Sequence, residues 1–195
     1  MSRKSEIERI TKETSVRLTI DLDGTGRTDI ATGIPLFDHM LTLAGVHGFF
    51  DIALQAQGDL AVDSHHTVED VGIVLGSAID AALADRKGIR RYGHAVTPMD
   101  EALATVALDL SRRPYLVFQV PACDVCATAF NRSLAKEFFK SVANHGGMNL
   151  HITVPYGENE HHVLEAAFKS FGRALRKAVD PDPRSSGVRS SKGSL

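Results

Sequence analysis

The sequence lacks the long apolar runs of a membrane protein. No run approaches the roughly 18 to 20 consecutive apolar residues that a helix needs to cross a bilayer. The first residues, MSRKSEIERI, also lack the apolar segment of a signal peptide. We therefore expect a soluble cytoplasmic protein without a membrane partner.

An excess of charge of one sign is also lacking. The formal net charge is -2 at pH 7, and acidic and basic residues are mixed along the chain. Because there is no broad basic face, a nucleic-acid partner is disfavoured. The 195 residues, 43% of them apolar, can bury a substantial core in one large domain or in two small fused units.

Cysteine is scarce, since Cys123 and Cys126 in PACDVCA are the only two. A structural zinc site needs two more thiolates or histidines to complete a tetrahedron, and the sequence offers no second pair at the usual spacing. We interpret the pair as two reduced thiols in a loop or at a strand end. A redox or metal role is the alternative.

What the sequence does have is a pattern of alternating and helical hydrophobic segments that occurs twice. The expected strands are residues 16–22, 28–34, 50–54, 102–111, 114–120 and 149–157, and the expected helices are residues 35–48, 65–83, 132–146 and 161–178. This order predicts two copies of a strand-strand-helix-strand-helix unit, at about residues 12–95 and 96–180. The predicted fold class is α+β, with two sheets that each carry a helix pair, in a single domain. Residues 181–195, rich in proline, serine and glycine, have the composition of a disordered tail.

A His-His-x-x-Glu motif begins the last helix of each half, in DSHHTVEDVG and NEHHVLEAAF. The motif residues are His65, His66, Glu69, His161, His162 and Glu165. Residues four apart on a helix lie on one face about 6 Å apart, so the first histidine and the glutamate of each motif converge on one point. The second histidine points about 100° further round, so each motif can serve two metal sites. One such pair at a helix start is commonly an exposed turn, but two copies in register favour metal binding.

Two further candidate ligands occupy matching places in the two halves. His39, in LFDHML, precedes the first motif by 26 residues, and Glu137, in AKEFFKS, precedes the second by 24. Imidazole and carboxylate donors without thiolate suit manganese, iron, zinc or nickel, with no sharp choice among them. The remaining histidines have no partner in the repeat, and a structural or surface role is expected for them.

Several segments in order resemble one enzyme family: GIPLFDHML, HHTVEDVGIVLG, GIRRYG, PMDEAL, LDLSRRPYL, HHVLEAAFKS and SSKG. Together they are similar to imidazoleglycerol-phosphate dehydratase of histidine biosynthesis, and the resemblance covers nearly the whole chain. It implies dehydration of D-erythro-imidazole glycerol phosphate to imidazole acetol phosphate. It also implies two fused βα repeats of the ribosomal protein S5 domain 2-like type, assembly as a homo-oligomeric shell of 24 subunits, and two manganese ions per active site at subunit contacts.

The resemblance divides the candidate ligands between the two ions. One ion would be held by His65, Glu69, His161 and Glu165, and the other by His39, His66, Glu137 and His162. Glu137 departs from the family pattern, because many members have histidine before the two phenylalanines of this segment. A carboxylate is still a competent ligand there, although it makes the site harder and adds negative charge.

The same resemblance assigns the substrate contacts. They are Glu13, Arg91, Arg113, Lys169, Ser190, Ser191 and Lys192. A phosphate monoester needs guanidinium or ammonium donors, which the basic members of this set supply. The tail is then better interpreted as a segment that orders over bound phosphate.

The mechanism that we expect uses the substrate's own imidazole. Metal-bound imidazolate would let the neighbouring hydroxyl leave through a diazafulvene-like intermediate, after which a carboxylate removes a proton from the next carbon. Glu165 and Glu13 are the candidates for this base, with Glu69 third. Two alternatives are a dinuclear metallohydrolase acting on a phosphate ester and a non-catalytic metal-storage shell.

Overall fold

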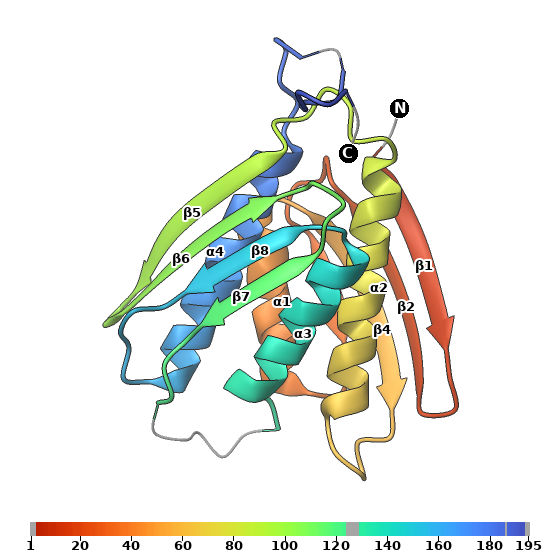
Figure 1. Ribbon diagram of the computed structural model, residues 1–195. Helices are drawn as coiled ribbons and strands as arrows, with labels where there is room; N and C mark the ends of the chain where they lie inside the picture. The colour runs from red at the N-terminus through yellow and green to blue at the C-terminus, as the bar shows by residue number, and fades with distance from the viewer. Residues whose placement is uncertain (1–2, 124–128, 186, 194–195) are drawn as a thin grey trace.

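The computed structural model describes residues 3–123, 129–185 and 187–193. Within them the chain forms two four-stranded sheets and four helices (Figure 1). The strands are β1 (Lys4–Ile10), β2 (Thr14–Asp21), β3 (Thr28–Ala31), β4 (Asp51–Gly58), β5 (Tyr92–Met99), β6 (Ala102–Asp109), β7 (Tyr115–Gln119) and β8 (Asn149–Thr153), and the helices are α1 (Pro35–Gly48), α2 (His65–Leu83), α3 (Arg132–His145) and α4 (Glu160–Val179).

The two sheets have the same topology. The strand orders are β1-β2-β4-β3 and β5-β6-β8-β7, and in each sheet the last pair is parallel and the other pairs are antiparallel. Both are half-buried: in β2, for example, Val16, Leu18 and Ile20 are buried and alternate with exposed residues. This is the α+β fold with two repeated units that the sequence predicted.

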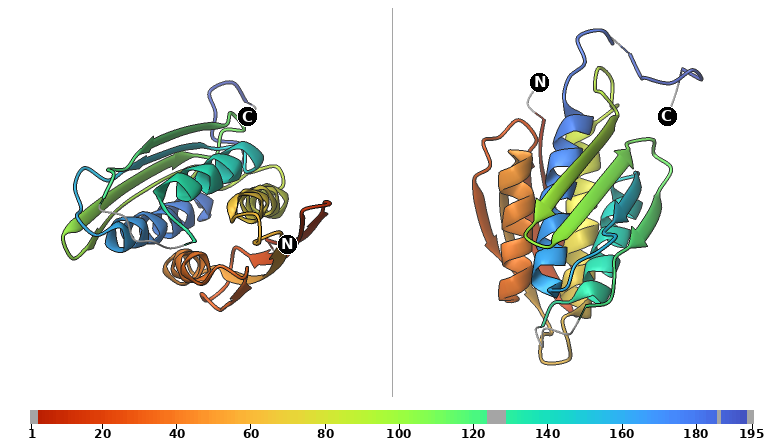
Figure 2. Two further views of the ribbon diagram at one scale, coloured as in Figure 1. Left: turned by 90° about the horizontal axis from the view of Figure 1, so that it is seen from below. Right: turned by 90° about the vertical axis from the view of Figure 1, so that its left-hand side faces the viewer.

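The helices fill the space between the sheets. α1 and α2 pack on the first sheet and α3 and α4 on the second, while α2 packs on α3 and α1 on α4. Figure 2 shows the resulting layers: two layers of helices lie between the two sheets. At the centre the ring of Phe138 lies 5.2 Å from that of Phe37 and 5.4 Å from that of Phe168, so α1, α3 and α4 share one aromatic core.

All four helices begin at one end of the molecule and finish at the other (Figure 1). We call the first the motif end, because both His-His-x-x-Glu motifs and the β1–β2 and β5–β6 turns lie there. The other is the tail end, next to the C-terminal segment 181–193. No helix among the described residues has both the length and the apolar composition needed to cross a membrane.

The expected helices and six of the eight strands are confirmed within a few residues, but the first strand of each sheet was not predicted. β1, with the sequence KSEIERI, is an edge strand without a buried residue, so it lacks the alternation that indicates a strand. β5 contains Gly93 and Pro98, which lower strand propensity, and Pro98 is tolerated because β5 is also an edge. Each unit therefore has three strands before its first helix, not the two that were expected, and the second unit begins at Tyr92.

Gly93 allows β5 to lie directly against α4. A Cβ atom at this position would be 1.9 Å from the carbonyl oxygen of Ala174 and 2.8 Å from the backbone nitrogen of Ala178. Because backbone atoms of a helix cannot move aside cheaply, Gly93→Ala is expected to lower the free energy of unfolding by about 1–3 kcal/mol. Chemical denaturation measures the change. Gly187→Ala is the matched control, since nothing lies within 4 Å of that Cβ, and equal midpoints for the two variants would contradict the prediction.

The cysteine pair is only partly described. Cys123 is half-buried, with its Sγ atom 3.5 Å from the carbonyl oxygen of Gly157. Cys126 lies outside the described residues. The interpretation of the pair as two thiols stays a prediction.

Candidate active site

A cluster of two histidines and one glutamate lies where α1 packs on α4. The Oε2 atom of Glu165 is 3.3 Å from Nε2 of His39 and 3.2 Å from Nε2 of His161. One ligand atom of each residue lies within 4.8 Å of those of the other two. The carboxylate is largely buried and both imidazoles are partly exposed, so the group opens to solvent on the histidine side. Two imidazole nitrogens and a carboxylate oxygen are a donor set that fits manganese, iron, zinc or nickel.

Lys169 holds the other oxygen of Glu165. It lies one helical turn further along α4, and its Nζ atom donates to Oε1. Burial alone would raise the pKa of Glu165, but the hydrogen bonds from Lys169 and His39 outweigh it, and the pKa is lowered. Glu165 is therefore an anion with one oxygen neutralised by a lysine and the other directed at two imidazoles.

The first motif forms a separate site on α2. His65 and Glu69 face each other with Nε2 and Oε2 3.9 Å apart, and both side chains are partly exposed. The helix α2 packs on α3, whereas the second motif is on α4 beside α1. Over residues 3–123, 129–185 and 187–193, His39, His161 and Glu165 are the one group of three or more possible ligands that converges. The chain thus does not gather either of the expected sets of four ligands by itself.

The grouping within the chain also differs from the division implied by the resemblance. That division gave His39 to one ion and His161 with Glu165 to the other. Here His39 and His161 both contact the same oxygen, Oε2 of Glu165. Helix packing is the reason, because α1 lies directly on α4. Glu137, on α3, is paired with Lys140 at 3.2 Å and is not part of the cluster.

The second histidine of each motif has a carboxylate on its Nδ1 atom. For His66 this partner is Asp59 at 3.0 Å, with an oxygen of Glu13 at 3.8 Å. For His162 it is Glu101 at 2.7 Å. Hydrogen bonds to Glu101, first from the backbone N–H of Asn159 and then from His162, lower its pKa to about 2.

The sequence did not reveal Asp59 and Glu101 as parts of the site. Glu101 lies 61 residues before its histidine, in the β5–β6 turn, and β5 itself was not predicted. A signal was present in the repeat, because Glu13 and Glu101 each directly precede the second strand of a sheet.

Most of the expected substrate contacts line one cavity at the tail end. Its volume is about 620 Å³, and its lining consists of Arg91, Tyr92, Arg113, Arg189, Ser190, Ser191 and Lys192. Four of these seven residues are cationic, which suits a phosphate group. Arg189 was not anticipated, although it stands next to the serine pair in the sequence.

Arg91 joins the tail to the second sheet. Its buried guanidinium makes a bidentate ion pair with Asp109 and donates from Nη1 to the carbonyl oxygen of Arg189 at 2.6 Å. Asp182 connects the tail to the loop before β5 as well. Its carboxylate accepts from Arg189, and its backbone N–H donates to the carbonyl oxygen of Gly88. The described part of the tail is therefore folded back onto the start of β5.

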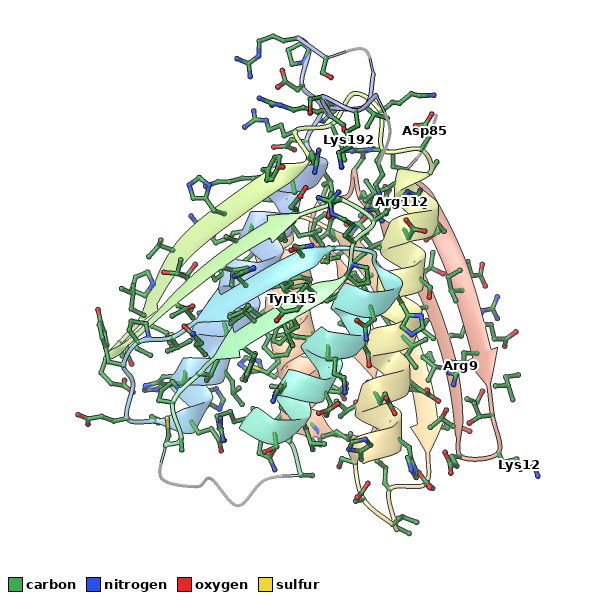
Figure 3. All side chains as sticks on the ribbon, viewed as in Figure 1. Arg9, Lys12, Asp85, Arg112, Tyr115 and Lys192 are labelled. Carbon is green, nitrogen blue, oxygen red and sulfur yellow. The ribbon has the colours of Figure 1, made fainter. Side chains whose placement is uncertain are left out.

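The expected substrate contacts thus fall into two groups that lie far apart. Glu13 is at the motif end, and Lys169, halfway along α4, contacts Glu165 of the cluster. The cavity is at the tail end, where Figure 3 labels Lys192 opposite Lys12 of the β1–β2 turn. The backbone N–H of Arg91 donates to the carbonyl oxygen of Ala178. At about 1.5 Å per residue, α4 spans about 25 Å between His161 and Ala178.

Comparison with known proteins gives a consistent result. The family model described as imidazoleglycerol-phosphate dehydratase matches residues 32–175. The chain is 57% identical to the imidazoleglycerol-phosphate dehydratase of Desulfosudis oleivorans over 100% of both chains, and 55% identical to that of Syntrophobacter fumaroxidans over 99% of this chain and 98% of the relative.

Solved structures agree in fold. The dehydratase from Pyrococcus furiosus in complex with (S)-C348 superposes with a TM-score of 0.85 at 38% identity, covering 97% of this chain and 100% of that one. The enzyme from Staphylococcus aureus superposes with a TM-score of 0.82 at 36% identity, covering 92% and 99%.

Proposed function

The chain belongs to the imidazoleglycerol-phosphate dehydratase family, and from this premise we propose that its His39, His161 and Glu165 cluster is part of the centre that dehydrates D-erythro-imidazole glycerol phosphate to imidazole acetol phosphate. The protein is a hydro-lyase of histidine biosynthesis that acts on a small molecule, and its family is metal-dependent. Manganese, at two ions per active site, is our proposal for the metal. The observation that supports a catalytic metal centre at this cluster is the convergence of two imidazoles on one carboxylate oxygen.

The proposed ligands of the metal are the eight residues expected from the sequence. They are His39, His65, His66, Glu69, Glu137, His161, His162 and Glu165. When bound, the metal would supply positive charge that favours the anionic form of the substrate's imidazole. The cluster supports this role because Lys169 already neutralises one oxygen of Glu165, and the other lies among the imidazole nitrogens of His39 and His161 that would bind the same ion.

Removal of the carbon-bound proton needs a carboxylate that can approach the substrate. Glu165 and Glu13 are both proposed for this step, with Glu69 as the third candidate. The geometry favours Glu13, because its side chain is 56% exposed and lies beside His66 without a closer partner among the described contacts. Glu165, by contrast, is held between Lys169 and two histidines, and its lowered pKa makes it a weaker base.

The cavity at the tail end is proposed to hold the substrate's phosphate. An imidazole ring joined to a three-carbon phosphate chain measures roughly 10 Å from end to end. By contrast, α4 rises about 25 Å from His161 of the cluster to Ala178, whose carbonyl oxygen accepts from Arg91 of the cavity. One substrate cannot reach both in one chain. We therefore propose that each active site combines the motif end of one subunit with the tail end of another, in a homo-oligomer of 24 subunits.

The product identifies the reaction. Manganese-loaded protein is expected to convert imidazole glycerol phosphate to a phosphorylated ketone, and a chelator should abolish turnover, which manganese restores. Liquid chromatography with mass spectrometry follows the ketone, and a phosphate assay runs in parallel. Release of inorganic phosphate would instead indicate a metallohydrolase, and failure of the loaded protein to bind the substrate would indicate a metal-storage role.

A further inference from the structure

The second histidine of each motif is held in the same way but by carboxylates from different places. Nδ1 of His162 lies 2.7 Å from Oε2 of Glu101, and Nδ1 of His66 lies 3.0 Å from Oδ2 of Asp59. In both rings this contact occupies Nδ1 and leaves Nε2 for another partner; Oδ2 of Asp100 lies 3.8 Å from Nε2 of His162. An imidazole that donates from Nδ1 to a carboxylate presents Nε2 as an acceptor, which is the form that binds a metal ion.

Both residues are held in their loops, Glu101 through its carboxylate and Asp59 through its backbone. Oε1 of Glu101 accepts the backbone N–H groups of Glu158 at 3.1 Å and Asn159 at 2.9 Å, so only Oε2 is left for His162. Asp59 follows β4 directly, and its backbone N–H donates to the carbonyl oxygen of Glu13 at 3.1 Å. Each histidine is thus oriented by a group tied to the backbone of a neighbouring loop.

The two halves differ in which carboxylate is used. Glu13 and Glu101 are topologically equivalent, since each immediately precedes the second strand of its sheet. Glu101 holds His162, whereas the oxygen of Glu13 stays 3.8 Å from His66 because Asp59 occupies the closer position. The second half has no carboxylate at the place of Asp59, because the strand register that matches Asp51 with Asn149 matches Asp59 with Gly157.

We infer that Asp59 and Glu101 are positioning residues that fix the Nδ1–H tautomer of His66 and His162 and direct Nε2 of each ring to a metal ion. Because Asp59 holds Nδ1 of His66 in the first half, the carboxylate of Glu13 is not needed for that contact and can act on the substrate. The inference about the metal rests on the proposed function, but the tautomer of each ring does not.

Metal affinity provides the first test. Glu101→Gln and Asp59→Asn are each expected to weaken manganese binding, measured by isothermal titration, by about 10- to 100-fold. Glu158→Gln is the matched control: it removes the same charge from the loop before α4, but its exposed side chain does not contact Nδ1 of His162. We expect its affinity to change less than twofold, and Glu13→Gln should lose turnover while keeping manganese affinity. Equal affinities for Glu101→Gln and Glu158→Gln would overturn the inference.

The tautomers provide a second test, made on the wild-type protein without metal. Nitrogen-15 NMR of the histidine-labelled, metal-free wild-type protein at alkaline pH should show His66 and His162 protonated at Nδ1, with the two signals assigned by single His→Asn substitutions. Protonation at Nε2 would contradict the inference. If wild-type protein failed to bind manganese while both rings were Nδ1–H, the proposed function would fail and the positioning role would stand.

Discussion

Glu165→Gln is expected to reduce turnover of imidazole glycerol phosphate by roughly 10²- to 10⁴-fold, whether the carboxylate acts as ligand or as base. Its Oε2 atom is the point on which His39 and His161 converge, and an amide oxygen carries no charge with which to hold a cation there. The substitution also removes the anion that Lys169 neutralises, so one positive charge is left beside two imidazoles. Steady-state kinetics and metal content, measured on the same sample, give the two parts of the effect.

The two measurements separate the roles of Glu165. We expect manganese content to fall together with turnover, since the geometry favours a ligand. Turnover lost with full metal content would assign Glu165 as the base, and full turnover with full metal content would remove it from both roles. Glu158→Gln is the control, because its exposed side chain stands just before the same helix and the charge change is identical.

The sequence was informative where a local pattern decides the structure. α1 and α2 have the predicted bounds, because each combines a helical apolar stripe with a clear end. β1 and β5 were missed because their stability comes from pairing with β2 and β6 rather than from their own side chains. Edge strands of this kind have no periodic signal to detect.

The site shows the same division between local and long-range information. The convergence of His161 and Glu165 followed from helical spacing alone. The presence of His39 in the same cluster did not, because it depends on α1 packing against α4 across the two halves of the chain. Asp59 and Glu101 depend on two turns that the fold brings to the motif end, and no spacing rule connects Glu101 with a histidine 61 residues away.

The largest predicted gain of activity comes from mixing two inactive variants. Glu165→Gln disables the motif end, and Arg113→Ala disables the tail end, where the Arg113 side chain is 66% exposed and lines the cavity. If each site combines the motif end of one subunit with the tail end of another, random co-assembly leaves both halves intact in about one site in four. Co-expressed oligomers should therefore regain about a quarter of wild-type turnover, although neither variant alone is active.

A second mixture makes this result specific to subunit sharing. His161→Asn and Glu165→Gln alter the same cluster of one chain, so oligomers that contain both variants should stay inactive. Recovery in this control would show that His161 and Glu165 of different chains can complete one site, so that recovery in the first mixture would not be specific to the two ends. No recovery in the first mixture, with co-assembly verified by mass spectrometry, would mean that every chain needs both of its own ends. A substrate of roughly 10 Å would then have to bridge about 25 Å of α4, so either the phosphate contacts assigned to the tail or the cluster assigned to the metal would have to be given up.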